Sequence, residues 1–117
     1  MELYILVDDV ARRRDIRVCW GLSIAGRLSD VQFLFDVGPS ISILKHNAEV
    51  LGLDLRKTSF VVISHWHVDH SGALPEFLKE FGPCPVYVPK VTWGPVTLAN
   101  CIEIEGWQEI PPKIYTT

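Results

Sequence analysis

The stretch Val62-Ile63-Ser64-His65-Trp66-His67-Val68-Asp69-His70-Ser71-Gly72 decides the fold of this chain. It continues a short apolar run, Phe60 to Ile63, whose β-branched residues are typical of a buried central strand. Three of the four histidines of the chain and one aspartate then follow within a few residues. Because sites in α/β proteins gather at the carboxyl ends of strands, we expect these side chains to form one.

The residue types and their spacing point to a metal centre. Residues two apart in an extended segment project to the same side, so His65 and His67 can reach a common metal ion. Asp69 and His70 follow where the chain bends, and we expect them to face a second position nearby. Imidazole suits zinc, iron and copper, and a carboxylate adds affinity for harder ions. Two ions about 3.5–4 Å apart can share a water molecule and convert it to a nucleophilic hydroxide.

A single histidine is usually an ordinary polar residue, and His46 illustrates that alternative. It falls within a predicted helix and off its apolar stripe, so we expect it to be exposed or to support the site, not to bind a metal. The helix predicted after His70 would turn its positive end toward the motif, which would help to hold an anionic substrate.

Alternating strands and helices are predicted outward from the motif. Ser40 is a favourable N-cap for a first helix, which ends near Gly52. A second helix presents an apolar face and stops at Gly82-Pro83. Strands are predicted at 3–7, 16–28, 31–37, 60–63, 85–89 and 101–105. This order predicts an α/β (α+β layered) fold with helices on one face of a mixed sheet.

Two of the predicted strands carry special residues. Gly21 and Gly26 interrupt the strand at 16–28, which indicates a bulge or a close approach of backbone. Prolines at both ends of 85–89 favour a place at the edge of the sheet, because proline cannot donate to a strand ladder.

Composition narrows the functional classes. Hydrophobic residues make up 48% and charged residues 21% of the chain, which is typical of a globular protein. The net charge of −3 and the lack of a basic stripe argue against nucleic acid as a partner. No segment approaches the roughly 20 apolar residues of a membrane span, and the first residues lack the basic start of a signal peptide. The three cysteines are scattered without CxxC spacing, so we expect a cytoplasmic protein.

The motif resembles the signature of the metallo-β-lactamase-fold metallohydrolases, His-x-His-x-Asp-His after a hydrophobic strand. Leu34-Phe35-Asp36-Val37-Gly38 resembles the strand-Asp-x-Gly turn of that superfamily. Finer details are similar to one subgroup, proteins like the dihydropterin-ribofuranosylaminobenzene phosphate synthase of methanopterin biosynthesis. Those details are Leu6-Val7-Asp8-Asp9, Trp20-Gly21-Leu22-Ser23 and His46-Asn47-Ala48-Glu49.

The resemblance implies the roles of the site residues. His65 and His67 would bind a first metal ion, and Asp69 and His70 a second, with Asp69 also taking part in catalysis. Asp36 would steady the motif without binding metal. Zinc is the metal we expect, with iron or manganese as alternatives. Trp66 would either wall the substrate cleft or pack inside the fold.

The superfamily builds an αββα sandwich of about twice this length, and its later part adds further histidine and acid ligands. No histidine follows His70 in this chain. We therefore expect residues 1–117 to form a single truncated domain, the N-terminal half of the sandwich. It would act as a metal-dependent hydrolase on a small-molecule ester, phosphoester or amide-type substrate. A homo-oligomer, in the simplest case a dimer, or a separately encoded C-terminal half would complete the site. The alternatives are a non-catalytic metal-binding or regulatory module and a truncated relic.

Overall fold

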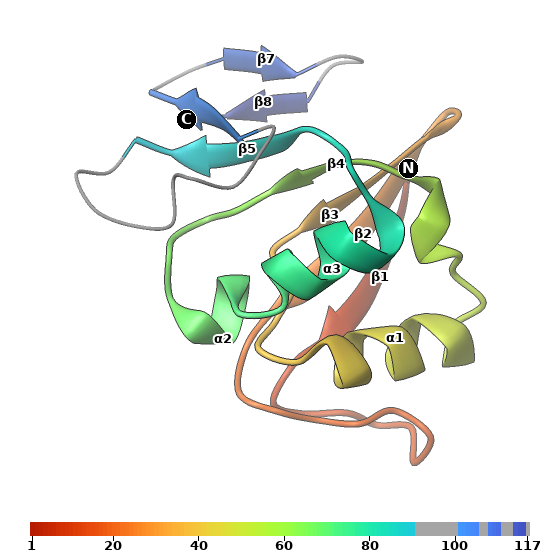
Figure 1. Cartoon of the computed structure of the whole chain (residues 1–117). Coiled ribbons are helices and arrows are strands. Elements are labelled where there is room, and N and C mark those ends of the chain that lie inside the picture. Colours follow the sequence, from red (N-terminus) through yellow and green to blue (C-terminus); the bar gives the residue numbers. More distant parts are fainter. Residues whose placement is uncertain (91–100, 106–107, 111–113, 117) are drawn as a thin grey trace.

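The structure is a computed structural model of the chain, and it describes residues 1–90, 101–105, 108–110 and 114–116 (Figure 1). Six strands form one sheet in the order β1-β2-β3-β4-β5-β6. Their bounds are Glu2–Val7, Ser23–Leu28, Val31–Phe35, Thr58–Val62, Val86–Pro89 and Cys101–Ile104. The first three strands pair antiparallel, and β3 to β6 pair parallel. The predicted mixed sheet is therefore confirmed.

In the described part of the chain, three α-helices and one 3-10 helix lie between these strands. Their bounds are α1 Ile41–Val50, η1 Leu55–Lys57, α2 Val68–Ser71 and α3 Leu74–Phe81. The predicted N-cap is confirmed, because the Ser40 side chain accepts a hydrogen bond from the backbone N–H of Ile43. Two further strands, β7 (Gln108–Ile110) and β8 (Ile114–Thr116), pair in a separate two-stranded sheet.

The main core lies between the sheet and the helices α1 and α3, which cover the same face of it (Figure 1). Ala25, Leu34, Val61 and Val86 are aligned by the register across four strands, and all four are completely buried. They pack with buried side chains from both helices, namely Leu44, Ala48, Leu74 and Phe77. This packing fixes the carboxyl ends of β3 and β4 relative to each other.

The opposite face of the sheet has a second apolar cluster around Phe33 and Phe60. Their rings stack with centroids 5.3 Å apart. Phe33 lies flat over Gly26, where an added Cβ would come within 2.4 Å of the ring. The glycine is therefore explained by a side-chain ring packed on it, and not by the bulge or the close approach of backbone that the sequence indicated. On the same face of the edge strand β1, Leu3 and Ile5 remain 65% and 58% exposed.

Several predicted boundaries were wrong. The strand predicted at 16–28 covers only Ser23–Leu28, because residues 16–22 form a loop whose backbone bonds to other segments. The strand predicted at 31–37 ends at Phe35. The prediction of an edge position for 85–89 was also wrong, since β5 lies between β4 and β6. The prolines at its two ends leave Val86, Tyr87 and Val88 free to pair on both sides.

Among the residues that the structure describes, none of the helices has both the length and the apolar character that crossing a membrane requires.

Candidate metal centre

The candidate site forms where two parallel strands end side by side. Phe35, the last residue of β3, pairs with Val62, the last residue of β4. The next residue, Asp36, donates its backbone N–H to the carbonyl oxygen of Val62 at 2.8 Å. Asp36 therefore lies beside the start of the histidine motif, at the strand ends where α/β proteins place their sites.

The carboxylate of Asp36 is completely buried and is surrounded by hydrogen-bond donors. Its Oδ1 accepts the backbone N–H of Ser64 at 2.7 Å. Its Oδ2 accepts the Ser64 hydroxyl at 2.5 Å and lies 2.7 Å from Nδ1 of His70. A buried carboxylate is costly unless it is hydrogen-bonded, and these donors satisfy it. Asp36 thus lies where a residue that steadies the motif has to lie.

The backbone at Asp36 explains why β3 stops at Phe35. Its φ of 58° is in the left-handed region, which aspartate tolerates better than most residues. The buried hydroxyl of Ser23 donates to the Asp36 carbonyl oxygen at 2.8 Å and holds this turn. The turn points the carboxylate toward the motif.

His65, Asp69 and His70 come together in one group. Each offers one ligand atom, and these atoms all lie within 4.8 Å of one another. The ring centroids of His65 and His70 are 4.2 Å apart. Nε2 of His70 lies 3.4 Å from Oδ2 of Asp69, whose side chain is 17% exposed. All three side chains are partly buried, which favours binding over free solvation.

His67 lies at the outer side of this group. Its ring centroid is 4.5 Å from that of His65, with the rings nearly perpendicular. The residue is exposed and is the N-cap of α2. Within the described residues, the group of mutually close ligand atoms does not include it. The structure therefore gathers three of the four predicted ligands and places the fourth next to His65.

The helix predicted after the motif is α3, Leu74–Phe81, with Pro75 in its first turn and Gly82 after its end, as expected. The short helix α2 starts at Val68, so Asp69 and His70 belong to its first turn, and α3 follows at Leu74. Backbone N–H groups of His70 and Ser71 both bond to the carbonyl oxygen of His67. Asp69 and His70 therefore lie in a short helix before α3, which the sequence did not predict.

A loop of residues 8–22 packs against the motif, and sequence reasoning missed its role. The backbone N–H of Leu22 donates to the Asp69 carbonyl oxygen at 3.2 Å. Gly21 has a φ of 147°, and an added Cβ would come within 2.2 Å of that same oxygen. The signal was present, because Gly21 was one of the two glycines predicted to mark a close backbone approach. Trp20 next to it is 80% exposed.

Two further predicted residues have structural explanations. The indole of Trp66 packs against the main core, which supports the packing alternative over the cleft wall. Its Nε1 is buried and lacks a hydrogen-bond partner among the described residues. His46 lies apart from the ligand group, and its Nε2 is 2.8 Å from the carbonyl oxygen of Asp15.

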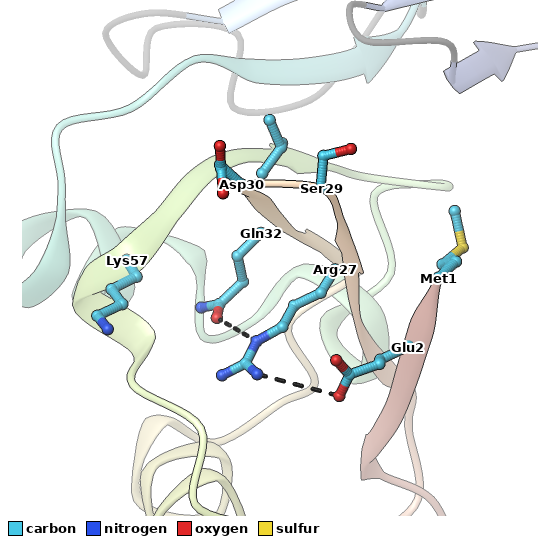
Figure 2. A pocket seen from close by; sticks show the side chains of 8 residues that line it. Met1, Glu2, Arg27, Ser29, Asp30, Gln32 and Lys57 are labelled. Atoms are coloured by element: carbon cyan, nitrogen blue, oxygen red, sulfur yellow. Dashed lines mark hydrogen bonds and ion pairs between the residues drawn. The ribbon is translucent and has the colours of Figure 1, made fainter.

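A cavity of about 400 Å³ lies at the other end of the parallel strands. Figure 2 shows Arg27 in its wall, held between Gln32 and Glu2, with Lys57 nearby. It adjoins the amino ends of β3 and β4, whereas the ligand group follows their carboxyl ends. This cavity is therefore separate from the candidate metal centre.

The donor set fits a divalent metal ion of the zinc type. Two imidazoles and one carboxylate are the ligands that catalytic zinc sites use, and such sites keep a position open for water or substrate. His70 also has the usual support of a metal-binding histidine, a carboxylate against its other ring nitrogen. The three cysteines do not belong to this group, and burial raises the pKa of each thiol.

Fold and site together define the class, an α/β domain with a candidate metal centre at the carboxyl ends of its parallel strands. The chain belongs to the metallo-beta-lactamase superfamily, whose sequence model matches residues 29–92, more than half of its length. Membership implies that a divalent metal is bound.

Solved structures share the fold of this chain. A metal-dependent hydrolase of the beta-lactamase superfamily superposes with a TM-score of 0.67 at 24% identity, over 97% of this chain and 46% of that one. A subclass B3 metallo-beta-lactamase of Bradyrhizobium japonicum matches with a TM-score of 0.56 at 22% identity, over 74% and 32%. A metallo-beta-lactamase from Novosphingobium pentaromativorans matches with a TM-score of 0.52 at 28% identity, over 58% and 25%.

The chain thus spans less than half the length of these solved structures. Among curated protein sequences none matches it significantly.

Proposed function

We propose that this chain provides the metal-binding part of a zinc-dependent hydrolase that cleaves an ester, phosphoester or amide-type bond in a small molecule. The observation that carries this proposal is the group of His65, Asp69 and His70 on the buried Asp36 carboxylate. A structural histidine cluster has no need of a buried anion that orients its rings, whereas a metal centre does.

The residues divide the work between binding and orientation. His65, His67, Asp69 and His70 would hold the metal, and Asp36 orients the ring of His70. Zinc, when bound, supplies Lewis acidity and lowers the pKa of water so that it can act as a nucleophile near neutral pH. Asp69 brings the carboxylate of the group, so it is the candidate for accepting a proton during the reaction.

We further propose that a second copy of the chain or a separately encoded C-terminal half completes the site. No histidine follows His70, so this sequence offers no later histidine ligand. The exposed apolar side chains of Leu3 and Ile5 support an association through the sheet face opposite the helices. Isolated exposed apolar residues are ordinary, but these two extend the apolar cluster of Phe33 and Phe60.

The subgroup resemblance gains support from how its segments pack. Asn47 donates to the carbonyl oxygen of Leu6 at 2.7 Å. The backbone N–H of Cys19, just before Trp20, donates to the carbonyl oxygen of Asp8. The three segments that resemble the dihydropterin-ribofuranosylaminobenzene phosphate synthase group therefore form one contiguous unit beside the candidate metal centre. We propose this subgroup as the nearest one, without a specific substrate.

Metal content and hydrolysis test the proposal together. Purified protein reconstituted with zinc, iron or manganese is analysed for bound metal, and phosphodiesters, thioesters and lactams are assayed with and without chelator. Asp69→Asn should lower the bound metal, whereas Asp30→Asn, the same change at an exposed turn, should leave it unchanged. Failure of the wild-type protein to retain any of the three metals would contradict the proposal.

The same samples separate the catalytic function from its alternatives. Chelator-sensitive hydrolysis would support the enzyme, and stoichiometric metal without hydrolysis, even in an assembled state, would favour the inert module. Light scattering then measures the oligomeric state, which tests whether a second chain is needed. We expect Ile5→Glu to shift a self-associated wild-type protein toward monomer, and a wild-type protein that is monomeric yet fully active would contradict the need for a second chain.

A further inference from the structure

The hydroxyl of Ser64 lies between the buried carboxylate and the first histidine of the motif. Its Oγ is 2.5 Å from Oδ2 of Asp36 and 2.9 Å from Nδ1 of His65. Ser64 is partly buried and directly follows the last residues of the β4 run. The Ser64 side chain therefore links the ring of His65 to the carboxylate of Asp36.

The directions of these hydrogen bonds follow from the chemistry of the groups. A carboxylate only accepts, so the single hydroxyl proton of Ser64 is donated to Asp36. The oxygen of Ser64 can then only accept from His65. Nδ1 of His65 must therefore carry the proton, which leaves its Nε2 unprotonated.

His70 reaches the same state by a direct route. Its Nδ1 lies 2.7 Å from Oδ2 of Asp36, so this nitrogen is also the donor. Its Nε2 is left facing Asp69 at 3.4 Å. One buried carboxylate thus sets the tautomer of two histidines, of one directly and of the other through a hydroxyl.

We propose that Ser64 is a positioning residue for the metal centre, because it relays the Asp36 carboxylate to His65 and fixes this ring with Nε2 free for a metal. This inference deepens the proposed function and rests on it where metal binding is concerned. Only an unprotonated ring nitrogen can bind a metal, so a fixed tautomer removes a cost of binding.

Loss of the hydroxyl should release His65 without removing any proposed ligand. In Ser64→Ala, the backbone N–H of residue 64 and the ring of His70 still donate hydrogen bonds to Asp36. Nδ1 of His65, however, loses its acceptor. We expect His65 to populate both tautomers and zinc affinity to fall about 10- to 100-fold, the usual effect of losing such a supporting contact.

The experiment has two readouts that do not depend on catalysis, the tautomers of the histidines and the zinc affinity. Nitrogen-15 NMR of the metal-free protein at mildly alkaline pH reports the protonated nitrogen of each ring, and competition with a chromophoric chelator gives the zinc affinity. Ser64→Thr and Ser64→Val form an isosteric pair that differs only in the hydroxyl. Thr should retain the wild-type tautomer and affinity, and Val should behave as Ala does.

Ser71 provides a matched control beside the same motif. Its hydroxyl donates to the backbone carbonyl oxygen of His67 at 2.9 Å and not to a histidine ring. Ser71→Ala should leave the His65 tautomer unchanged and the zinc affinity within about twofold, since it removes no support of a ligand ring.

The outcomes distinguish this inference from the proposed function. A wild-type protein that fixes His65 as predicted but retains no metal would overturn the metal centre and leave the relay standing. A wild-type His65 protonated at Nε2 would overturn the relay, whatever the variants do. Equal affinities of the Thr and Val variants would overturn the role of the hydroxyl even if metal is bound.

Discussion

Asp36 is the residue on which the candidate site depends most. It is buried, it has a left-handed backbone, and its two carboxylate oxygens accept from Ser64 and face His70. The position therefore selects for a side chain that tolerates positive φ and also accepts several hydrogen bonds. Aspartate meets both conditions, and asparagine meets the first but replaces one acceptor by a donor.

Asp36→Asn should therefore weaken both stability and metal binding. The backbone can stay as it is, but the new amide group faces donors. We expect a loss of about 1–3 kcal/mol of unfolding free energy from the mismatched buried groups. Zinc affinity should fall as well. Urea unfolding and chelator competition measure the two effects, with Asp30→Asn as the control. Unchanged affinity in a folded Asp36→Asn protein would argue against its role in orienting the ligands.

Gly21 makes a second prediction at this scale. Gly21→Ala combines positive φ with a clash against the carbonyl oxygen of Asp69, whereas Gly52→Ala has a φ of 72° and open space around the new Cβ. We expect Gly52→Ala to lower the free energy of unfolding by about 1–2 kcal/mol, because alanine disfavours positive φ, and Gly21→Ala to lower it further. Thermal or urea unfolding compares the stabilities of the two variants. Metal affinity should fall only in the Gly21 variant, and an equal effect of both variants would show that the contact with Asp69 does not matter.

At the scale of elements, the loop 8–22 and the helix α1 act as one support for the site. Asn47 on α1 is completely buried. Its Oδ1 accepts the backbone N–H of Arg17, and its Nδ2 donates to the carbonyl oxygens of Leu6 and Arg17. One side chain thereby ties the loop to both β1 and α1, and the loop in turn contacts Asp69.

Asn47→Ala should destabilise the protein by about 3 kcal/mol, because it leaves buried backbone groups without partners. Alanine has the higher helix propensity, so the loss cannot come from the helix itself. The exposed Ser42→Ala on the same helix is the control. Hydrogen exchange of the loop amides should rise in Asn47→Ala. Protection equal to the wild type would show that other contacts hold the loop.

The element predictions succeeded where the pattern was local. Ser40, the apolar stripe of α1 and the run at 60–63 depend on residues near each other in sequence. The failures at 16–22 and 85–89 came from contacts that no local pattern contains. Leu22 bonds to Asp69, and β5 gains its second neighbour from β6, a later segment of the chain.

At the scale of the whole molecule, the two faces of the sheet differ. The helices cover one face, and the other has the smaller apolar cluster of Phe33 and Phe60. The covered face holds the main core, including the buried Cys84. Burial raises the pKa of the Cys84 thiol above its ordinary value of 9.0, and it raises those of Cys19 and Cys101 in the same direction. The folded protein therefore keeps these protons to higher pH than the unfolded chain does.

Stability should consequently fall at alkaline pH. A raised folded-state pKa contributes stability that is fully present below the unfolded-state pKa, near 9.0, and is lost as the pH rises through the folded-state value. Urea unfolding of the metal-free protein is measured from about pH 7 to about pH 11. The free energy of unfolding should be constant at first and then decline. Cys84→Ala should decline less steeply, and an equally steep decline would assign the effect to other groups.

The sequence alone determined the motif, the strand and helix types around it and the superfamily, because each of these depends on residues close together in the chain. Only the tertiary structure decided how the site is supported. Asp36 meets Ser64 across a sequence separation of 28 residues because β3 and β4 pair in parallel. That pairing joins His65 and His70 to one buried carboxylate, so the histidine motif is held by a residue that its own spacing does not specify.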